Sequence, residues 1–134
     1  MQPTIRSIAH LCAVVALFGA AAVQAQTPPP IQRTVVGKGD VSVPGREAIV
    51  ARVEIAAGAS VARHTHPGDE ISYIAEGETE LLIDGEPARV VKAGESFVIP
   101  AGVVHAARAI GTGPVKLIGV YVVEKGKPLA TPAP

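Results

Sequence analysis

Two stretches of the chain hold most of its chemistry: residues 58–77, GASVARHTHPGDEISYIAEG, and residues 94–109, GESFVIPAGVVHAARA. In the first stretch, His64 and His66 are two residues apart, so on a strand both imidazoles point to the same side of the sheet. A Pro-Gly-Asp sequence follows and predicts a turn, after which Glu70 brings a carboxylate back toward the two rings. The first stretch therefore predicts two imidazoles and one carboxylate at a single place.

The second stretch adds a third imidazole, His105, directly after a Pro-Ala-Gly turn. Three imidazole nitrogens and one carboxylate oxygen are typical ligands of divalent transition metals, and they leave coordination positions open for water, dioxygen or substrate. The alternative is that the three histidines are packed or pH-sensitive residues. We expect one divalent metal ion per chain (Mn, Fe, Zn, Ni or Cu), with an identity that the sequence does not decide. The predicted ligands are His64, His66, Glu70 and His105.

The surrounding sequence predicts an all-β domain, because short β-branched runs alternate with Gly, Pro and Asp turn signals every 8 to 12 residues or so. No amphipathic pattern longer than about two helical turns is present. The expected strands are residues 48–55, 71–75, 79–83, 88–91, 96–99, 103–109 and 115–123. This spacing indicates a sandwich or a closed barrel.

The two stretches resemble the sequence motifs of the cupin family. The first motif, G-x5-H-x-H-x3-E-x6-G, is matched at every spacing by Gly58, His64, His66, Glu70 and Gly77. The second motif, G-x5-P-x-G-x2-H-x3-N, is matched by Gly94, Pro100, Gly102 and His105, while Ala109 stands at the Asn position. That Asn is not a metal ligand in the family, so its loss bears on loop geometry. The resemblance implies a small jelly-roll barrel, or double-stranded β-helix, with the metal inside.

The N-terminal residues 1–25 have the pattern of a signal peptide: a basic residue, a 12-residue apolar run and a Val-Gln-Ala cleavage site. An uncleaved membrane anchor is the alternative, but a spanning helix needs about 20 apolar residues. Cleavage would remove Cys12, the single cysteine, and leave no stable membrane anchor. We expect an exported protein, periplasmic or secreted. Its parts would be a Pro-rich linker (26–32), a cupin domain (33–126) and a poorly ordered Pro/Ala tail (127–134).

The composition argues against nucleic-acid binding. Lys and Arg together number 12, Asp and Glu also number 12, and the formal net charge is zero. Aromatic residues make up 3% of the chain and Trp is absent, so base-stacking platforms are not expected. The expected partner is a small molecule.

Strand alternation predicts which side chains line the cavity beside the ligands. The expected lining residues are Ser72, Ile74, Phe97, Ile99 and Ala107. Ser72 is the only clear polar group among them, and no additional carboxylate or histidine is expected there. By the same alternation we expect Arg63, Arg108 and Tyr73 to point outward, and Asp69 to be a turn residue.

The ligand set predicts a metal-dependent oxidoreductase of the dioxygenase kind, acting on a small oxygen-rich organic molecule. A non-catalytic binding protein, or a lyase, isomerase or decarboxylase that uses the metal as a Lewis acid, remains an alternative. The cupin lyases that cleave dimethylsulfoniopropionate place a Tyr where Ser72 stands, and the cupin hydroxynitrile lyases place a Gln where Glu70 stands. Residues 115–123 are apolar on both faces apart from Lys116, which favours a homodimer.

Overall fold

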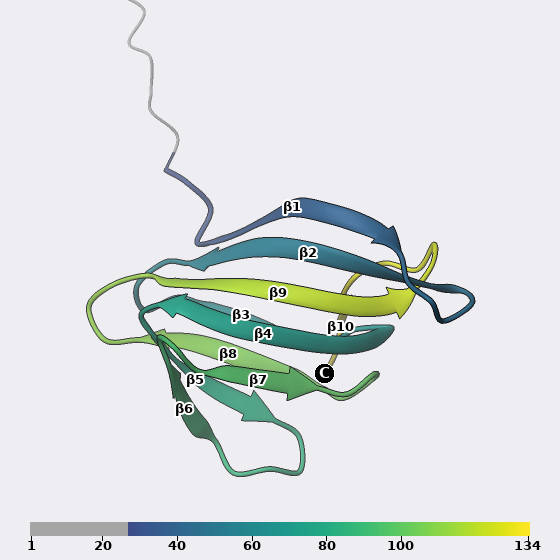
Figure 1. The fold of residues 1–134 in the computed structure, drawn as a ribbon. Helices are drawn as coiled ribbons and strands as arrows, with labels where there is room; N and C mark the ends of the chain where they lie inside the picture. Colours follow the sequence, from purple (N-terminus) through teal and green to yellow (C-terminus); the bar gives the residue numbers. More distant parts are fainter. Residues whose placement is uncertain (1–26) are drawn as a thin grey trace, which may run out of the picture.

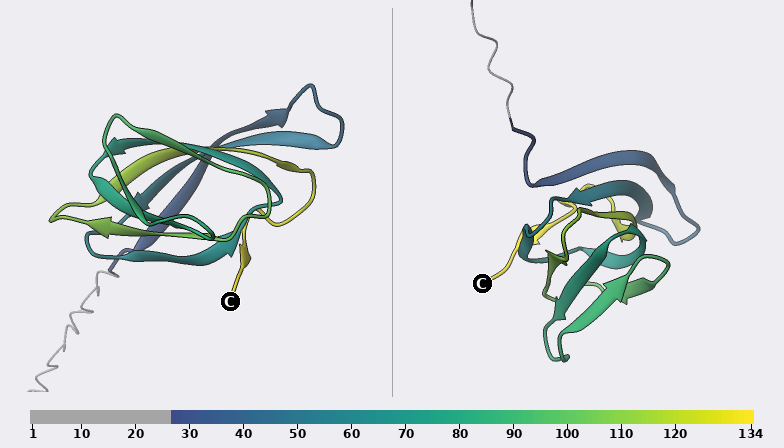
Figure 2. Two further views of the ribbon diagram at one scale, coloured as in Figure 1. Left: turned by 90° about the horizontal axis from the view of Figure 1, so that it is seen from below. Right: turned by 90° about the vertical axis from the view of Figure 1, so that its left-hand side faces the viewer.

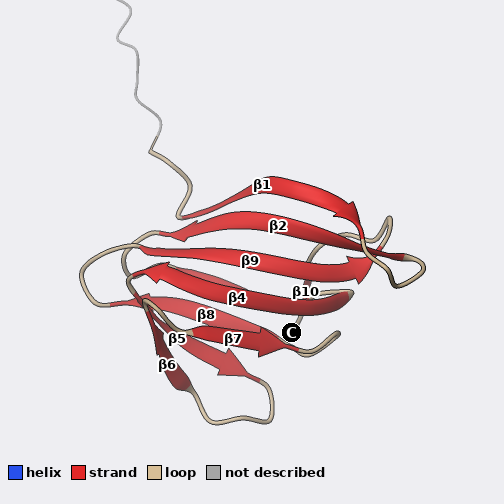
Figure 3. Cartoon of the chain, in the orientation of Figure 1, coloured by secondary structure: helices blue, strands red, loops and turns tan. Residues whose placement is uncertain are grey.

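The computed structural model describes residues 27–134, which form strands, turns and loops without a helix (Figure 3). The strands are β1 (Ile31–Asp40), β2 (Arg46–Ile55), β3 (Ser60–Thr65), β4 (Gly68–Glu76), β5 (Glu78–Ile83), β6 (Arg89–Lys92), β7 (Ser96–Ile99), β8 (His105–Ile110), β9 (Val115–Glu124) and β10 (Thr131–Pro132). The predicted all-β fold is confirmed.

The strands form two antiparallel five-stranded sheets that roll around a common interior (Figures 1 and 2). The first sheet has the order β1-β2-β9-β4-β7, and the second has the order β10-β3-β8-β5-β6. Apart from the pairs β1-β2 and β5-β6, neighbouring strands in each sheet are not consecutive in the chain, as in a jelly roll. The first sheet is built mainly from long strands, because β1, β2 and β9 each span 10 residues.

Alternation along the strands produces the core. In β2 and β9, every second residue is buried and its neighbours are half-buried or exposed. The interior is filled by aliphatic side chains and Phe97, with Tyr121 as the largest fully buried side chain. One glycine is required by close packing: a Cβ on Gly68 would lie 2.0 Å from the Val122 carbonyl oxygen. Gly68 therefore lets β4 approach β9 directly beside the Glu70 carboxylate.

The N-terminal boundary differs from the sequence-based expectation. Strand β1 begins at Ile31 and pairs with β2 from Ile31↔Ile55 to Asp40↔Glu47. The sequence predicts no strand here and assigns residues 31 and 32 to the Pro-rich linker, so this boundary is corrected. The predicted signal peptide, residues 1–25, lies outside the described residues. Within residues 27–134, no helix has the length and hydrophobicity needed to cross a membrane.

The C-terminal tail also differs, since it is part of the barrel. Strand β10 pairs with β3 through Thr131↔Thr65 and Pro132↔His64. The Ala133 amide donates to the Arg63 carbonyl at 3.0 Å, which extends the pairing. The expectation of a poorly ordered tail was wrong, because β3 offers a free edge that a short proline-containing segment can still pair with.

Candidate metal centre

Four side chains from three places in the chain meet inside the barrel. His64 lies near the end of β3, His66 in the turn after it, Glu70 on β4 and His105 at the start of β8. Their potential ligand atoms all lie within 4.8 Å of one another. The residues that the sequence predicts as metal ligands are thus brought together, although His66 sits in the turn rather than on the strand with His64.

Each histidine is oriented by a backbone carbonyl. The Nδ1 atoms of His64, His66 and His105 lie 2.8, 2.6 and 3.0 Å from the carbonyl oxygens of Ala62, Leu129 and Val103, respectively. An Nδ1–H that donates to a carbonyl leaves the Nε2 lone pair free, which is the tautomer that binds metals. All three Nε2 atoms therefore face the same interior point.

The distances between ligand atoms fit a metal ion. His64 Nε2 is 3.2 Å from His66 Nε2, and the Glu70 Oε2 is 2.9 Å from His66 Nε2 and 3.2 Å from His105 Nε2. A cation with ligand bonds of about 2.1 Å holds ligands at right angles about 3 Å apart. The close approach of two Nε2 lone pairs is unfavourable unless a proton or a cation lies between them. The donor set and its spacing are suited to a divalent transition metal.

Glu70 is ionised in this environment. Burial raises the pKa of its carboxyl, but hydrogen bonds with His105, His66 and Ser72 outweigh this effect and hold the pKa well below its usual range. Ser72, which is fully buried, donates its hydroxyl to Glu70 Oε1 at 2.6 Å. Oε2 therefore remains directed at the three imidazoles.

The histidines on the second sheet differ in proton affinity. Burial and the neighbouring imidazoles His105 and His66 lower the pKa of half-buried His64 to about 4. Burial also lowers the pKa of His105, but its hydrogen bond with Glu70 and the Val103 carbonyl outweigh burial and raise it. At neutral pH, His64 is therefore neutral, whereas Glu70 strengthens the binding of a proton by His105.

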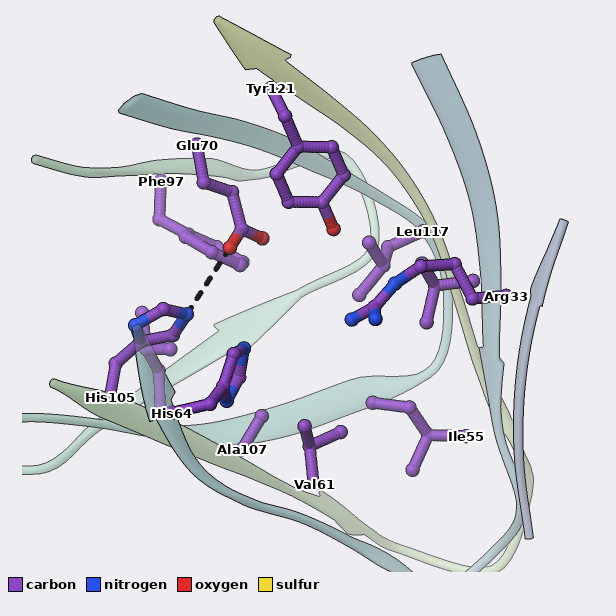
Figure 4. A pocket seen from close by; sticks show the side chains of 12 residues that line it. Arg33, Ile55, Val61, His64, Glu70, Phe97, His105, Ala107, Leu117 and Tyr121 are labelled. Atoms are coloured by element: carbon purple, nitrogen blue, oxygen red, sulfur yellow. Dashed lines mark hydrogen bonds and ion pairs between the residues drawn. The ribbon is translucent and has the colours of Figure 1, made fainter. Parts of the chain in front are cut away.

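A cavity that opens to solvent adjoins this cluster (Figure 4). Of the predicted lining residues, Phe97 and Ala107 face the cavity. Ser72, Ile74 and Ile99 are buried on the same inner faces but lie within the core. The other walls are aliphatic: Val53, Ile55, Val61, Leu81 and Leu117.

Two polar residues of the cavity are absent from the sequence-based prediction: Arg33 on β1 and Tyr121 on β9 (Figure 4). The expectation that Ser72 is the only clear polar lining group was therefore wrong. Tyr121 pairs with Glu70 across β9 and β4, and its ring centroid is 4.8 Å from that of His66. Burial and the Glu70 charge raise the pKa of Tyr121 to about 12, so its phenol stays protonated. Alternation within residues 115–123 was the available signal for Tyr121.

The three side chains that the sequence predicts to point outward lie outside the cavity, as predicted: Arg63, Arg108 and Tyr73. Arg63 forms a two-point ion pair with Asp84, with distances of 2.7 and 2.8 Å, and Arg108 pairs with Glu80 at 2.8 Å. Tyr73 is about half exposed on the outer face of β4. Asp69 accepts a hydrogen bond from the Ala101 amide at 3.0 Å. Asp69 lies on β4, so the expectation that it is a turn residue was wrong. The contact ties the start of β4 to the turn before His105.

Comparison with known proteins defines the class of this molecule. A family model described as "Cupin domain" matches residues 51–123, more than half of the chain. The chain belongs to the cupin family, in agreement with the two motifs and the two-sheet barrel.

Its relatives are diverse in function. The chain is 30% identical over 95 residues to germin-like protein subfamily 2 member 2 of Arabidopsis thaliana, covering 65% of this chain and 43% of the relative. It is 42% identical over 45 residues to the dimethylsulfoniopropionate lyase DddQ of Ruegeria pomeroyi, covering 34% of this chain and 22% of that protein. A structure of recombinant oxalate oxidase in complex with glycolate superposes with a TM-score of 0.62 at 28% identity, covering 79% of this chain and 56% of the other. The chain spans less than half the length of these two curated relatives.

Proposed function

We propose that this cupin binds one divalent metal ion per chain and is a metal-dependent oxidoreductase of the dioxygenase kind, acting on a small oxygen-rich organic molecule. The observation that carries the proposal is the convergence of three Nε2 atoms and one carboxylate oxygen beside an open cavity. When bound, Fe or Mn would supply dioxygen and redox chemistry, whereas Zn would supply Lewis acidity. A divalent ion with three neutral imidazoles and one carboxylate has a net charge of about +1, which favours an anionic oxygen ligand.

Within the cavity, the chain's own residues have distinct tasks. The backbone carbonyls of Ala62, Leu129 and Val103 hold the imidazoles in the binding tautomer. Ser72 keeps one Glu70 oxygen occupied, so that the other oxygen is the ligand. The aliphatic walls and Phe97 restrict water around a bound molecule.

The first test is elemental analysis of protein exported to a periplasm and purified without chelators, beside a Glu70→Ala control. About one Mn or Fe per chain, lost in the control, is expected. Oxygen uptake with Fe(II) over a panel of small acids and phenols then tests the reaction. Equal metal content in the wild type and the Glu70→Ala variant would overturn the ligand assignment.

A Lewis-acid lyase, isomerase or decarboxylase is the second candidate, and Tyr121 is the observation that favours it. A buried phenol with a pKa of about 12 is a neutral proton donor beside the metal ligands. This reaction class predicts that zinc-loaded protein turns over substrate without consuming oxygen. Tyr121→Phe should abolish that turnover and leave the metal content unchanged. A metal-dependent binding protein without turnover is the remaining alternative. It predicts tight ligand binding by the metal-loaded protein with no product in either assay.

We further propose that the chain is exported through cleavage after Ala25 and assembles as a homodimer. In support of the dimer, apolar side chains form a row across the outer face of the first sheet, because Val50 and Ile71 each pair with Val120, and Ile71 also pairs with Val98. Ile71 and Val98 are exposed. N-terminal sequencing of the exported protein tests cleavage. Sedimentation of wild type and Val98→Glu tests the dimer, which the charge should weaken.

A further inference from the structure

Arg33 is the cationic side chain of the cavity that the metal cluster does not explain. It lies on β1, outside both motifs and outside the 51–123 family match, and pairs with Val53 on the inner face. Figure 4 shows its guanidinium pointing into the cavity toward the Tyr121 hydroxyl. Unlike Arg63 and Arg108, Arg33 forms no ion pair with an acidic side chain among residues 27–134.

The surroundings of Arg33 define a place for an anion. Val53, Ile55, Val61 and Leu117 form apolar walls at this end of the cavity. Arg33 is an exposed residue, so its guanidinium is accessible to an anion that enters between these walls. Its planar fork of N–H donors matches the two oxygens of a carboxylate.

The distance from this cation to the metal cluster sets the size of the ligand. The Arg33 guanidinium carbon is 6.0 Å from the Tyr121 ring centroid, and that centroid is 4.8 Å from the His66 ring. The Arg33 guanidinium carbon is therefore at most about 11 Å from the His66 ring. A molecule of a few carbon atoms spans the two ends.

We infer that Arg33 is a specificity-determining residue and that the cavity takes a small organic anion with two acidic ends. One oxygen group would face the metal, and a carboxylate at the far end would be held by Arg33, with the Tyr121 phenol as a second donor. The inference rests on the proposed function, because it uses the same metal-bearing cavity. It narrows the proposed ligand class from small oxygen-rich molecules to dicarboxylates whose two acidic groups are joined by an apolar carbon chain.

Calorimetry on zinc-loaded protein tests the inference with the series malonate, succinate, glutarate and adipate, each beside its half-amide. A half-amide keeps the shape and one carboxylate but loses the second charge. For the best chain length, we expect the wild type to prefer the dicarboxylate by about tenfold or more, the usual range for a charge-assisted hydrogen bond. Arg33→Gln should abolish that preference, and Arg33→Lys should retain part of it.

The matched control is Arg52→Gln, on the neighbouring strand β2, whose exposed side chain lies on the opposite face of the sheet. It should keep the wild-type preference. Zinc content is measured for every variant, so loss of metal, which would contradict the proposed function, is separated from loss of selectivity. The inference is overturned if zinc-loaded wild type prefers no dicarboxylate over its half-amide, or if Arg33→Gln keeps the preference. Tighter binding of 3-phosphonopropionate than of succinate would also overturn the carboxylate assignment.

Discussion

The two sheets of the barrel supply different chemistry to one cavity. The first sheet provides the charged and proton-donating groups Arg33, Glu70 and Tyr121, whereas the second provides the imidazoles of His64 and His105. His66 lies in the turn that connects them. A metal ion at this place would bond to both layers at once. Metal binding at this place would therefore be coupled to the packing of the two sheets.

The largest expected effect comes from removing the anionic ligand on the first sheet. Glu70→Gln keeps the shape of the side chain but removes the charge that balances the ion, so we expect metal content to fall from about one per chain to near zero. Atomic emission after dialysis measures it. Ser72→Ala is the matched control, because it removes only the hydrogen bond to Oε1 and should weaken binding by about 10- to 100-fold. Equal losses in the two variants would contradict the separate roles of charge and orientation.

The next largest effect concerns the stability that a metal ion would add by binding side chains of both sheets. Because the metal binds the folded site, it should stabilise the protein by about 4 kcal/mol when free metal is 1,000 times the Kd. Thermal unfolding with zinc and with chelator measures this difference. Glu70→Gln should show the same midpoint under both conditions. A wild type that also shows no difference would mean that the metal does not join the two layers.

A smaller effect comes from the C-terminal segment that leads into β10. Leu129 supplies the carbonyl that orients His66, so a chain ending at Lys127 should bind zinc about tenfold more weakly or worse, by competition with a fluorescent chelator. A chain ending at Ala130 lacks β10 but retains that carbonyl, and it should lie between this variant and the wild type. Full affinity in the shorter chain would show that the carbonyl is dispensable.

Lowering the pH should reduce the free energy of unfolding of the metal-free protein, mainly through protonation of His64. The folded pKa of His64, about 4, is below its ordinary value of 6.5, so its stabilising contribution is complete above pH 6.5 and is lost as the pH falls toward 4. Protonation of Glu70 also reduces the stability of the folded protein, but at lower pH, because its pKa is lowered on folding. The raised pKa of His105 has the opposite effect, because the folded protein gains stability as His105 takes up a proton. Urea unfolding of metal-free wild type should therefore show a steeper loss between pH 6.5 and 4 than His64→Gln. Parallel curves for the two proteins would contradict this.

The smallest expected effect is on the outside of the second sheet. Arg63 pairs with Asp84 at the surface and contacts no metal ligand. Arg63→Ala should therefore retain wild-type metal content by atomic emission. Substantial loss would mean that the outer surface of β3 controls the position of His64.

Sequence reasoning located the cluster because the motif spacings place His64, His66 and Glu70 close together around a single turn of the chain. It missed Tyr121 because that residue reaches Glu70 only through the pairing of β9 with β4, a contact between segments about 50 residues apart. Arg33 was missed because β1 follows a proline run and its neighbours carry no strong alternation. Strand alternation correctly predicts that Ile74 and Ile99 point into the barrel. It does not predict that they lie within the core instead of lining the cavity, because that depends on how the barrel closes.

The tail strand β10 has a consequence for solubility. Without it, β3 would present its unpaired N–H and C=O groups to solvent at the edge of the second sheet, and such edges recruit strands from other molecules. Pairing with Thr131 and Pro132 occupies that edge. Proline lacks an N–H, so β10 is itself a poor template for a further strand. The C-terminal segment, whose Leu129 carbonyl orients His66, covers part of this edge and should therefore also disfavour edge-to-edge aggregation.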